Sequence, residues 1–91
     1  MDSNQLDIEQ LRKDSTQLQG ARSGVYFLFS AEKLVYVGEG WNCLLRVAEH
    51  TRRDSNKAFL RWNFMPMDDK QERKTLERDL RRKYRPLYNR I

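Results

Sequence analysis

Two short runs of apolar and aromatic residues, separated by only four residues, limit the folds open to this chain. The runs cover residues 25–29 and 34–37, and residues 30–33 between them are suited to a turn. Apolar and aromatic runs of this length favour strands, and a short turn joins strands that lie next to each other. The sequence therefore predicts an antiparallel hairpin.

Each strand of this hairpin carries a tyrosine close to a glycine, in the strings Gly24-Val25-Tyr26 and Tyr36-Val37-Gly38. Because side chains alternate along a strand, Tyr26 and Tyr36 share a face only if the loop has an odd number of residues. A loop of this kind places Tyr26 opposite Gly38 or opposite Tyr36. Phenols take part in proton transfer, and a glycine such as Gly38 lets a ligand approach the backbone. On their own, the two tyrosines fit either chemistry or core packing.

The rest of the chain predicts helices and one more strand. Asn42 and Asp69 are placed to cap helices, and the residue before Pro86 ends the second of them. An apolar run that stops at Pro66 predicts a strand. The expected elements are a short helix over residues 4–13 within an N-terminal arm (1–23), a helix over 43–53, a strand within 57–67 and a helix over 70–84.

Length and composition exclude several classes of protein. Ninety-one residues are enough for a single domain with one modest core. The single cysteine, Cys43, excludes an internal disulfide and a cysteine-rich zinc site. No apolar run is long enough to span a membrane, and the first ten residues are polar and acidic, unlike a signal peptide. We therefore expect a cytoplasmic protein.

Basic residues are concentrated in the last quarter of the chain. Residues 70–91 hold nine Lys and Arg against three acidic residues. This density favours neutralisation of phosphates in a nucleic acid, although a solvated helix with internal ion pairs is the alternative. Within the helix we expect Arg73, Arg81 and Arg82 to contact a nucleic-acid backbone, without reading its sequence.

The helix over residues 43–53 has two different faces on a helical wheel. One face is expected to pack on the sheet and contains Leu44, Val47, Ala48 and Thr51. The opposite face carries Arg46, His50 and Arg53. This basic and titratable stripe is either a ligand-binding surface or an ordinary solvated face. His50 is the one histidine of the chain, so it cannot build a zinc site by itself, but it is suited to proton transfer.

Glu77 lies at the flank of the apolar stripe of the helix over residues 70–84. A carboxylate in this position needs a partner. It can pair with Arg73 or Arg81, each four residues away. It can instead bind Mg²⁺, which takes one or two carboxylates and keeps several waters. Two phenols, an imidazole, an arginine and a metal-binding carboxylate in a basic domain together suit metal-assisted phosphodiester hydrolysis.

From residue 24 to residue 89 the chain resembles the GIY-YIG nuclease superfamily, and in particular the nuclease domain of the bacterial excision-repair incision subunit. The two tyrosine-glycine strings match its two signatures. The positions that match the family's catalytic arginine, its His or Tyr one turn later, its metal-binding glutamate and its closing asparagine are Arg46, His50, Glu77 and Asn89. The asparagine follows a Tyr-Arg-Pro segment, as it does in the family.

The resemblance implies an α/β (α+β) fold, with a small central antiparallel sheet of three strands flanked by helices. It implies an endonuclease that hydrolyses DNA with one Mg²⁺ or Mn²⁺ ion, and RNA stays open as a substrate. The resemblance also implies the roles of the site residues: Tyr26 as general base, helped by Tyr36 or His50, and Arg46 as the group that stabilises the phosphate. By the same resemblance, Glu77 is expected to hold the metal and Asn89 to order the site.

One position departs from the family. Many members carry a lysine or arginine just after the second signature, where this chain has Glu39. A negative charge there can weaken phosphate binding, add a metal or water contact, or point to solvent. The main alternative to the nuclease is a nucleic-acid-binding module that keeps the fold without catalysis, and a protein-interaction adaptor is a third possibility.

Overall fold

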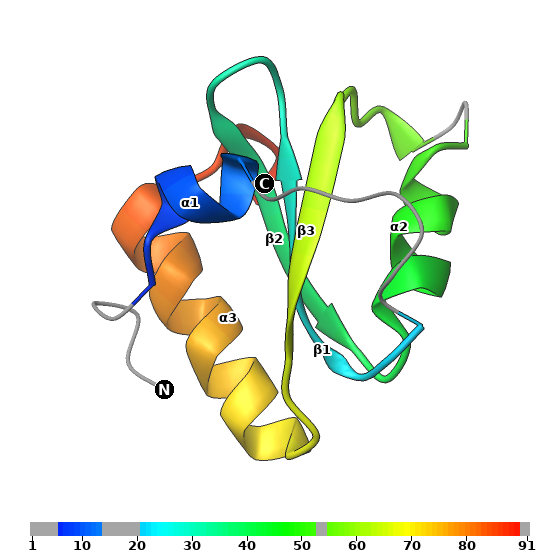
Figure 1. Cartoon of the computed structure of the whole chain (residues 1–91), viewed down its shortest axis with the longest axis vertical. Helices are drawn as coiled ribbons and strands as arrows, with labels where there is room; N and C mark the ends of the chain where they lie inside the picture. Colours follow the sequence, from blue (N-terminus) through cyan, green and yellow to red (C-terminus); the bar gives the residue numbers. More distant parts are fainter. Residues whose placement is uncertain (1–5, 14–20, 53–54, 90–91) are drawn as a thin grey trace.

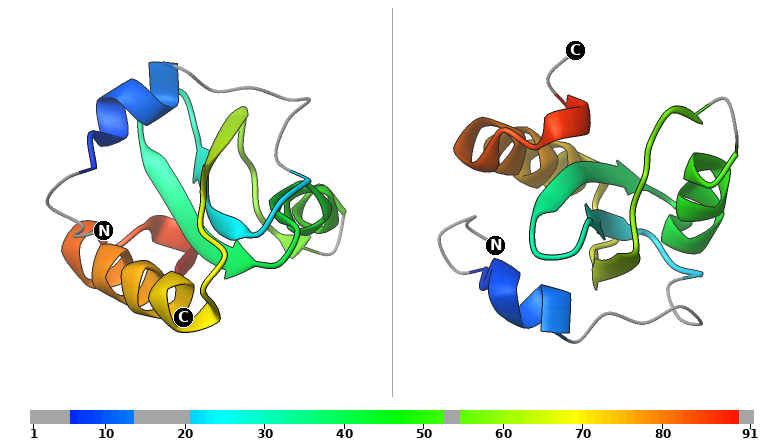
Figure 2. Two further views of the ribbon diagram at one scale, coloured as in Figure 1. Left: turned by 60° about the horizontal axis from the view of Figure 1, so that its bottom comes forward. Right: turned by 90° about the horizontal axis from the view of Figure 1, so that it is seen from above.

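The computed structural model describes residues 6–13, 21–52 and 55–89, which form a three-layered α+β domain (Figure 1). Strands β1 (Gly24–Phe29), β2 (Leu34–Gly40) and β3 (Arg61–Pro66) make one antiparallel sheet in the order β2-β1-β3. Helix α2 (Cys43–His50) covers one face of the sheet, and helices α1 (Ile8–Lys13) and α3 (Lys70–Tyr84) cover the other (Figures 1 and 2). A short 3-10 helix, η3 (Leu87–Asn89), follows α3 and lies against β2. The predicted fold class is confirmed.

The central strand β1 is buried on both faces, and this gives the domain two apolar clusters. Val25, Phe27 and Phe29 point to the α3 side, where they pack with Leu76 and Leu80. The alternate residues of β1 point to the α2 side, in a cluster that holds Tyr26, Leu28, Cys43, Val47 and Trp62. Tyr26 is thus one of the fully buried side chains of the α2 side.

In the described part of the chain, no helix has the length and apolar character needed to cross a membrane.

The hairpin loop has an even number of residues, yet the tyrosines share a face. Residues 30–33 connect the strands, as predicted, but the rule that an even loop puts the tyrosines on opposite faces is wrong for this hairpin. A register shift compensates for the even loop, because Phe29 pairs with Leu34 whereas Leu28 pairs with Tyr36. The extra residue in β2 restores the alternation, as β-bulges do. Tyr26 consequently lies opposite Gly38, which is one of the two predicted registers.

The predicted element ends agree with the structure for some elements and differ for others. Helix α3 has the predicted bounds: Asp69 accepts a hydrogen bond from the backbone N–H of Glu72 at 2.9 Å, and Arg85 ends the helix with a φ of 46°. Two elements are shorter than predicted, since α1 begins at Ile8 and α2 ends at His50, whereas β3 lies within the predicted range and ends at Pro66 as expected.

The buried face of α2 differs from the predicted one. Val47 and the half-buried Leu44 contact the sheet as expected, but Ala48 and Thr51 are exposed. His50 is buried instead of facing solvent, and it shares the sheet-facing side of the helix with Cys43 and Val47. The helix is thus turned so that its histidine points into the protein, toward β1 and β2.

Candidate active site

Tyr26 lies across the strand from Gly38, and its ring occupies the space that a side chain at position 38 would need. A Cβ atom built on Gly38 would overlap the hydroxyl and the ring of Tyr26. Gly38 is itself buried. This corrects the expectation that Gly38 leaves room for a ligand, because the protein's own phenol fills that room.

We predict that Gly38→Ala displaces the Tyr26 ring. The added methyl group cannot be accommodated without moving the phenol, and overpacking of this kind costs about 1–3 kcal/mol. The midpoint of urea unfolding should fall by the corresponding amount. Gly40→Ala is the matched control, because a Cβ there meets only the flexible side chain of Arg46, at 3.1 Å. Equal midpoints for the two variants would contradict this prediction.

Tyr26, Tyr36 and His50 form a compact cluster on the α2 side of the sheet. The Tyr26 hydroxyl and the Nε2 atom of His50 are 2.8 Å apart and hydrogen-bonded. The ring centroid of Tyr36 lies 4.8 Å from that of His50 and 6.0 Å from that of Tyr26. The ammonium group of Lys57 lies over the Tyr36 ring, 5.2 Å from its centroid. The two predicted phenols and the imidazole therefore do meet in space.

The environment of this cluster shifts the pKa values of Tyr26 and His50 in opposite directions. Burial and the nearby Tyr36 raise the pKa of Tyr26, and the positive charge of Arg46 opposes that increase. Burial, with the charges of Lys57 and Arg46, lowers the pKa of His50 to about 4. At neutral pH the imidazole is therefore uncharged, and its Nε2 can accept the Tyr26 proton.

The lowered pKa of His50 predicts a pH-dependent stability. In the unfolded chain His50 takes up its proton near its ordinary pKa of 6.5, but in the folded protein only near 4. The unfolded state therefore binds more protons between these values, and up to about 3 kcal/mol of stability is lost as the pH falls from 6.5 to 4. A His50→Gln variant lacks this loss, so its stability deficit relative to wild type should shrink across that window in urea titrations. Parallel curves for the two proteins would argue against it.

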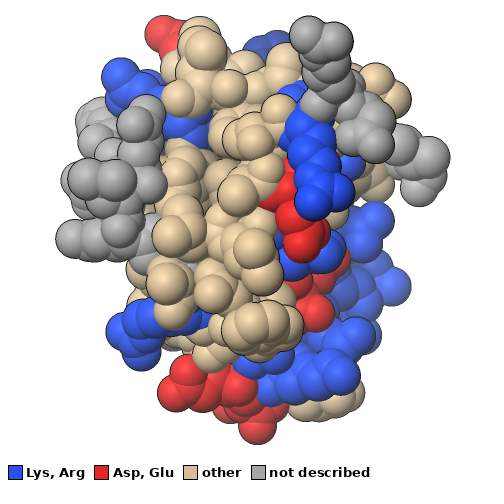
Figure 3. Space-filling model, turned by 90° about the vertical axis from the view of Figure 1, so that its right-hand side faces the viewer, with Lys and Arg blue, Asp and Glu red and all other residues tan. Residues whose placement is uncertain are grey.

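Arg46 lies at the edge of this cluster, on the exposed side of α2. Its side chain passes over Gly40, since a Cβ there would lie 3.1 Å from its Cγ. Its guanidinium makes a half-exposed ion pair with Glu49 at 3.0 Å. A surface pair of this kind is weak, so Arg46 can turn to an anion at little cost. On the side of the molecule that carries α2, charged side chains of both signs gather along one margin beside a broad uncharged area (Figure 3).

Glu77 belongs to the helix on the opposite face of the sheet. It is mostly buried and pairs with Arg81 at 3.3 Å, which is one of its two predicted partners. Burial raises its pKa, as does the charge of Glu39, and Arg81 opposes the increase. No hydrogen bond or ion pair among the described residues joins Glu77 to Tyr26 or Arg46. The structure thus brings four of the predicted site residues together on the α2 side and leaves Glu77 across the edge strand β2.

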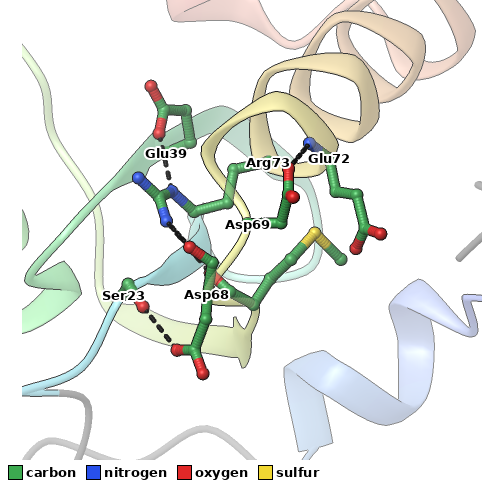
Figure 4. A network of polar contacts seen from close by, with 7 residues as sticks. Ser23, Glu39, Asp68, Asp69, Glu72 and Arg73 are labelled. Carbon is green, nitrogen blue, oxygen red and sulfur yellow. Dashed lines mark hydrogen bonds and ion pairs between the residues drawn. The ribbon is translucent and has the colours of Figure 1, made fainter.

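Arg73 is buried rather than available for nucleic acid, which corrects the prediction of a backbone contact. Its guanidinium donates to Glu39 Oε2 at 3.0 Å and to the carbonyls of Met67 and Asp68 at 3.3 and 2.7 Å (Figure 4). Only 8% of the Arg73 side chain and 16% of the Glu39 side chain are exposed. The Glu39 charge is therefore neutralised by Arg73, which is none of the three roles predicted for it.

The side chain of Asn89 hydrogen-bonds to the free edge of the sheet, on strand β2. Its Oδ1 accepts a hydrogen bond from the Val37 N–H at 2.8 Å, and its Nδ2 donates to the Val37 carbonyl at 3.0 Å. Both amide groups are thereby used to hold the backbone between Tyr36 and Gly38. This geometry suits the ordering role that the resemblance implies for Asn89.

The other predicted basic residues lie apart from the tyrosine cluster. Arg81 and Arg82, with Arg78, Arg85 and Asn89, line a groove of about 750 Å³ beside the end of α3. Arg53 lies outside the described residues. The sequence reasoning missed the contact between Arg73 and Glu39, although a signal was present. Arg73 has helical spacing with Leu76 and Leu80, which placed it on the buried face.

The donor set suits a metal ion that takes most of its ligands from elsewhere. In the part of the chain that the structure describes, no group of three or more His, Cys, Asp or Glu residues is placed to hold a metal. A single carboxylate, Glu77, is consistent with Mg²⁺, which keeps waters and binds substrate phosphates. It does not suit zinc, which needs three or four protein ligands.

Known structures similar to this chain include forms of the GIY-YIG N-terminal endonuclease domain of UvrC from Thermotoga maritima. A point mutant of that domain, bound to its catalytic divalent cation, has a TM-score of 0.67 and 23% identity, covering 88% of this chain and 94% of the other. The magnesium-bound form has a TM-score of 0.66 and 22% identity, covering 88% and 96%. No protein-family model matches the chain, and no curated protein does. The likeness shows that this chain has the GIY-YIG nuclease fold.

Proposed function

Because the chain has the fold of GIY-YIG nuclease domains, we propose that it is a divalent-metal-dependent endonuclease that hydrolyses phosphodiester bonds in DNA. The observation that carries the proposal is the hydrogen bond of 2.8 Å between the Tyr26 hydroxyl and a neutral His50. This bond holds the hydroxyl of Tyr26, the group proposed as general base, in one orientation.

In the proposed reaction, Tyr26 takes a proton from the attacking water after releasing its own proton to solvent. His50 Nε2 orients the phenol through the hydrogen bond of 2.8 Å, and the positive charge of Arg46, which opposes the raised pKa of Tyr26, favours the phenolate. Tyr36 packs against the rings of both Tyr26 and His50 and holds them in their relative orientation. Arg46 turns from Glu49 to the phosphate and stabilises the charge that develops on it.

Glu77 would hold Mg²⁺ or Mn²⁺ at the edge of β2. The ion supplies positive charge against the phosphate and the leaving oxygen. Asn89 supports this edge by fixing Val37, so that Gly38 and the Tyr26 ring keep their relative positions. Arg81 and Arg82 extend the site by binding the backbone of the same DNA along their groove, and Arg53 remains a predicted contact.

Supercoiled plasmid tests the proposal directly. Wild-type protein with Mg²⁺ should nick the plasmid, and EDTA should stop the reaction. Tyr26→Phe removes the proton-transferring hydroxyl while keeping the ring over Gly38, so the rate should fall by about 10²- to 10⁴-fold. Circular dichroism should show an unchanged fold in the variant.

Two outcomes would count against this function. If Tyr26→Phe nicks plasmid at the wild-type rate, the phenol is not the base. If pure wild-type protein binds DNA in a salt-sensitive way but cleaves no form of it with Mg²⁺ or Mn²⁺, the binding module without catalysis is the better explanation.

A further inference from the structure

Trp41 exposes a large aromatic surface next to the proposed site. The indole is 71% exposed, whereas the other tryptophan, Trp62, is 5% exposed in the core. Within the described residues, no hydrogen bond or ring contact engages the Trp41 side chain. Tryptophan is enriched at binding sites, where an apolar ring lies beside polar groups.

The backbone around Trp41 is fixed on both sides. Gly40 is paired with Gly24 at the end of the sheet, and the Cys43 N–H donates to the Arg22 carbonyl at 2.9 Å. Asn42 caps α2 by accepting from the Leu45 N–H at 3.0 Å. The exposure of the indole is therefore a property of an anchored turn.

Trp41 cannot cover itself by packing on its own helix. A residue just before a helix cap often packs on the fourth helical residue, but here that residue is Arg46. Leu45, one turn after Trp41, is also exposed, at 47%. Trp41 and Leu45 are thus both exposed at the start of α2, and the side chain of Arg46 passes over Gly40, the residue before Trp41.

We propose that Trp41 stacks on an unpaired nucleobase of the DNA substrate, next to the phosphate bound by Arg46. The substrate part of this inference rests on the proposed function. An aromatic surface beside a phosphate-binding guanidinium matches the alternation of bases and phosphates along a single strand. The net charge of +5 favours a polyanion over an apolar protein surface. The base must be unpaired, because a duplex hides the faces of its bases.

Binding measured in EDTA, where no cleavage occurs, tests this proposal. The probes are a single-stranded oligonucleotide of about 16 thymidines and a duplex of the same length. Trp41→Ala should raise the Kd for the single strand by about 5- to 150-fold, the effect of losing one stacked base, and should leave the Kd for the duplex within about twofold. Trp41→Phe, which keeps a stacking surface, should recover most of the affinity.

Two internal controls sharpen the test. Leu60 is as exposed as Trp41, at 71%, but it precedes β3 at the opposite end of the sheet, so Leu60→Ala should bind both probes as wild type does. The single strand should also quench the tryptophan fluorescence of wild type but not of Trp41→Phe, since Trp62 is buried.

Equal weakening of single-strand and duplex binding by Trp41→Ala would overturn the proposal, as would no change in either, which would leave the indole to a protein partner. The nuclease proposal is tested by different outcomes from the stacking proposal. Selective loss of single-strand binding in a protein that never cleaves DNA would support stacking and reject the nuclease. If the protein nicks plasmid and Trp41→Ala leaves both Kd values unchanged, the nuclease is supported and stacking is rejected.

Discussion

Glu77→Gln is expected to abolish plasmid cleavage while leaving the fold intact. The substitution removes the one carboxylate proposed to hold the metal. The neutral amide that replaces it is a poor ligand for Mg²⁺. A catalytic metal ion contributes several kcal/mol to the transition state, so the rate should fall by on the order of 10³-fold or more. The same variant should lose Mn²⁺ binding in a direct titration followed by electron paramagnetic resonance.

Stability measurements separate this loss from unfolding. Burial already disfavours the charged form of Glu77, and its exposed partner Arg81 offsets this only in part, so the neutral amide should change the unfolding midpoint little. Glu72→Gln is the matched control, because Glu72 is an exposed carboxylate on the same helix. If Glu77→Gln cleaves plasmid as fast as Glu72→Gln, Glu77 does not hold the catalytic metal.

Arg73→Ala should destabilise the fold strongly. It leaves the Glu39 carboxylate buried without its cation and removes the donor to the carbonyls of Met67 and Asp68. Breaking a buried ion pair by deleting one partner typically costs about 3–5 kcal/mol. The loss should appear as a lower midpoint in urea unfolding at pH 7.

A control and a second variant test the reason for this loss. Arg78→Ala removes an arginine of the same helix whose side chain is 58% exposed and should cost less than about 1 kcal/mol. The double variant Glu39→Gln with Arg73→Met removes both charges and should recover part of the stability lost in Arg73→Ala. Equal losses in Arg73→Ala and Arg78→Ala would show that burial of the pair carries little energy.

Local patterns in the sequence predicted the parts of the fold that depend on neighbouring residues. The cap at Asp69 and the proline after Arg85 set both ends of α3, and the apolar run of β1 identified the central strand. Residues 30–33 were identified as the hairpin loop, but the bulge in β2 that keeps the tyrosines on one face was not predicted. The turned face of α2 depends on where Cys43 and His50 find space against the sheet, and this is a tertiary effect.

The site shows the same division. The resemblance to the nuclease family identified the residues of the α2-side cluster, whereas helical periodicity alone placed His50 on the face of its helix away from the sheet. The burial of Arg73 was not predictable from nearby residues, because its partner Glu39 lies 34 residues earlier in the chain. Asn89 likewise finds Val37 only after α3 has returned the chain to the sheet.

The two hydrogen bonds between Asn89 and Val37 also affect whether a second copy of the chain can pair with strand β2. Strand β2 is an edge strand, and an open edge of apolar residues is a template on which a second copy of the chain can add its own strand. The Asn89 amide takes the place of one such residue by satisfying both the N–H and the carbonyl of Val37. One side chain thus satisfies the backbone groups of Val37 on this edge while it holds the backbone of the site.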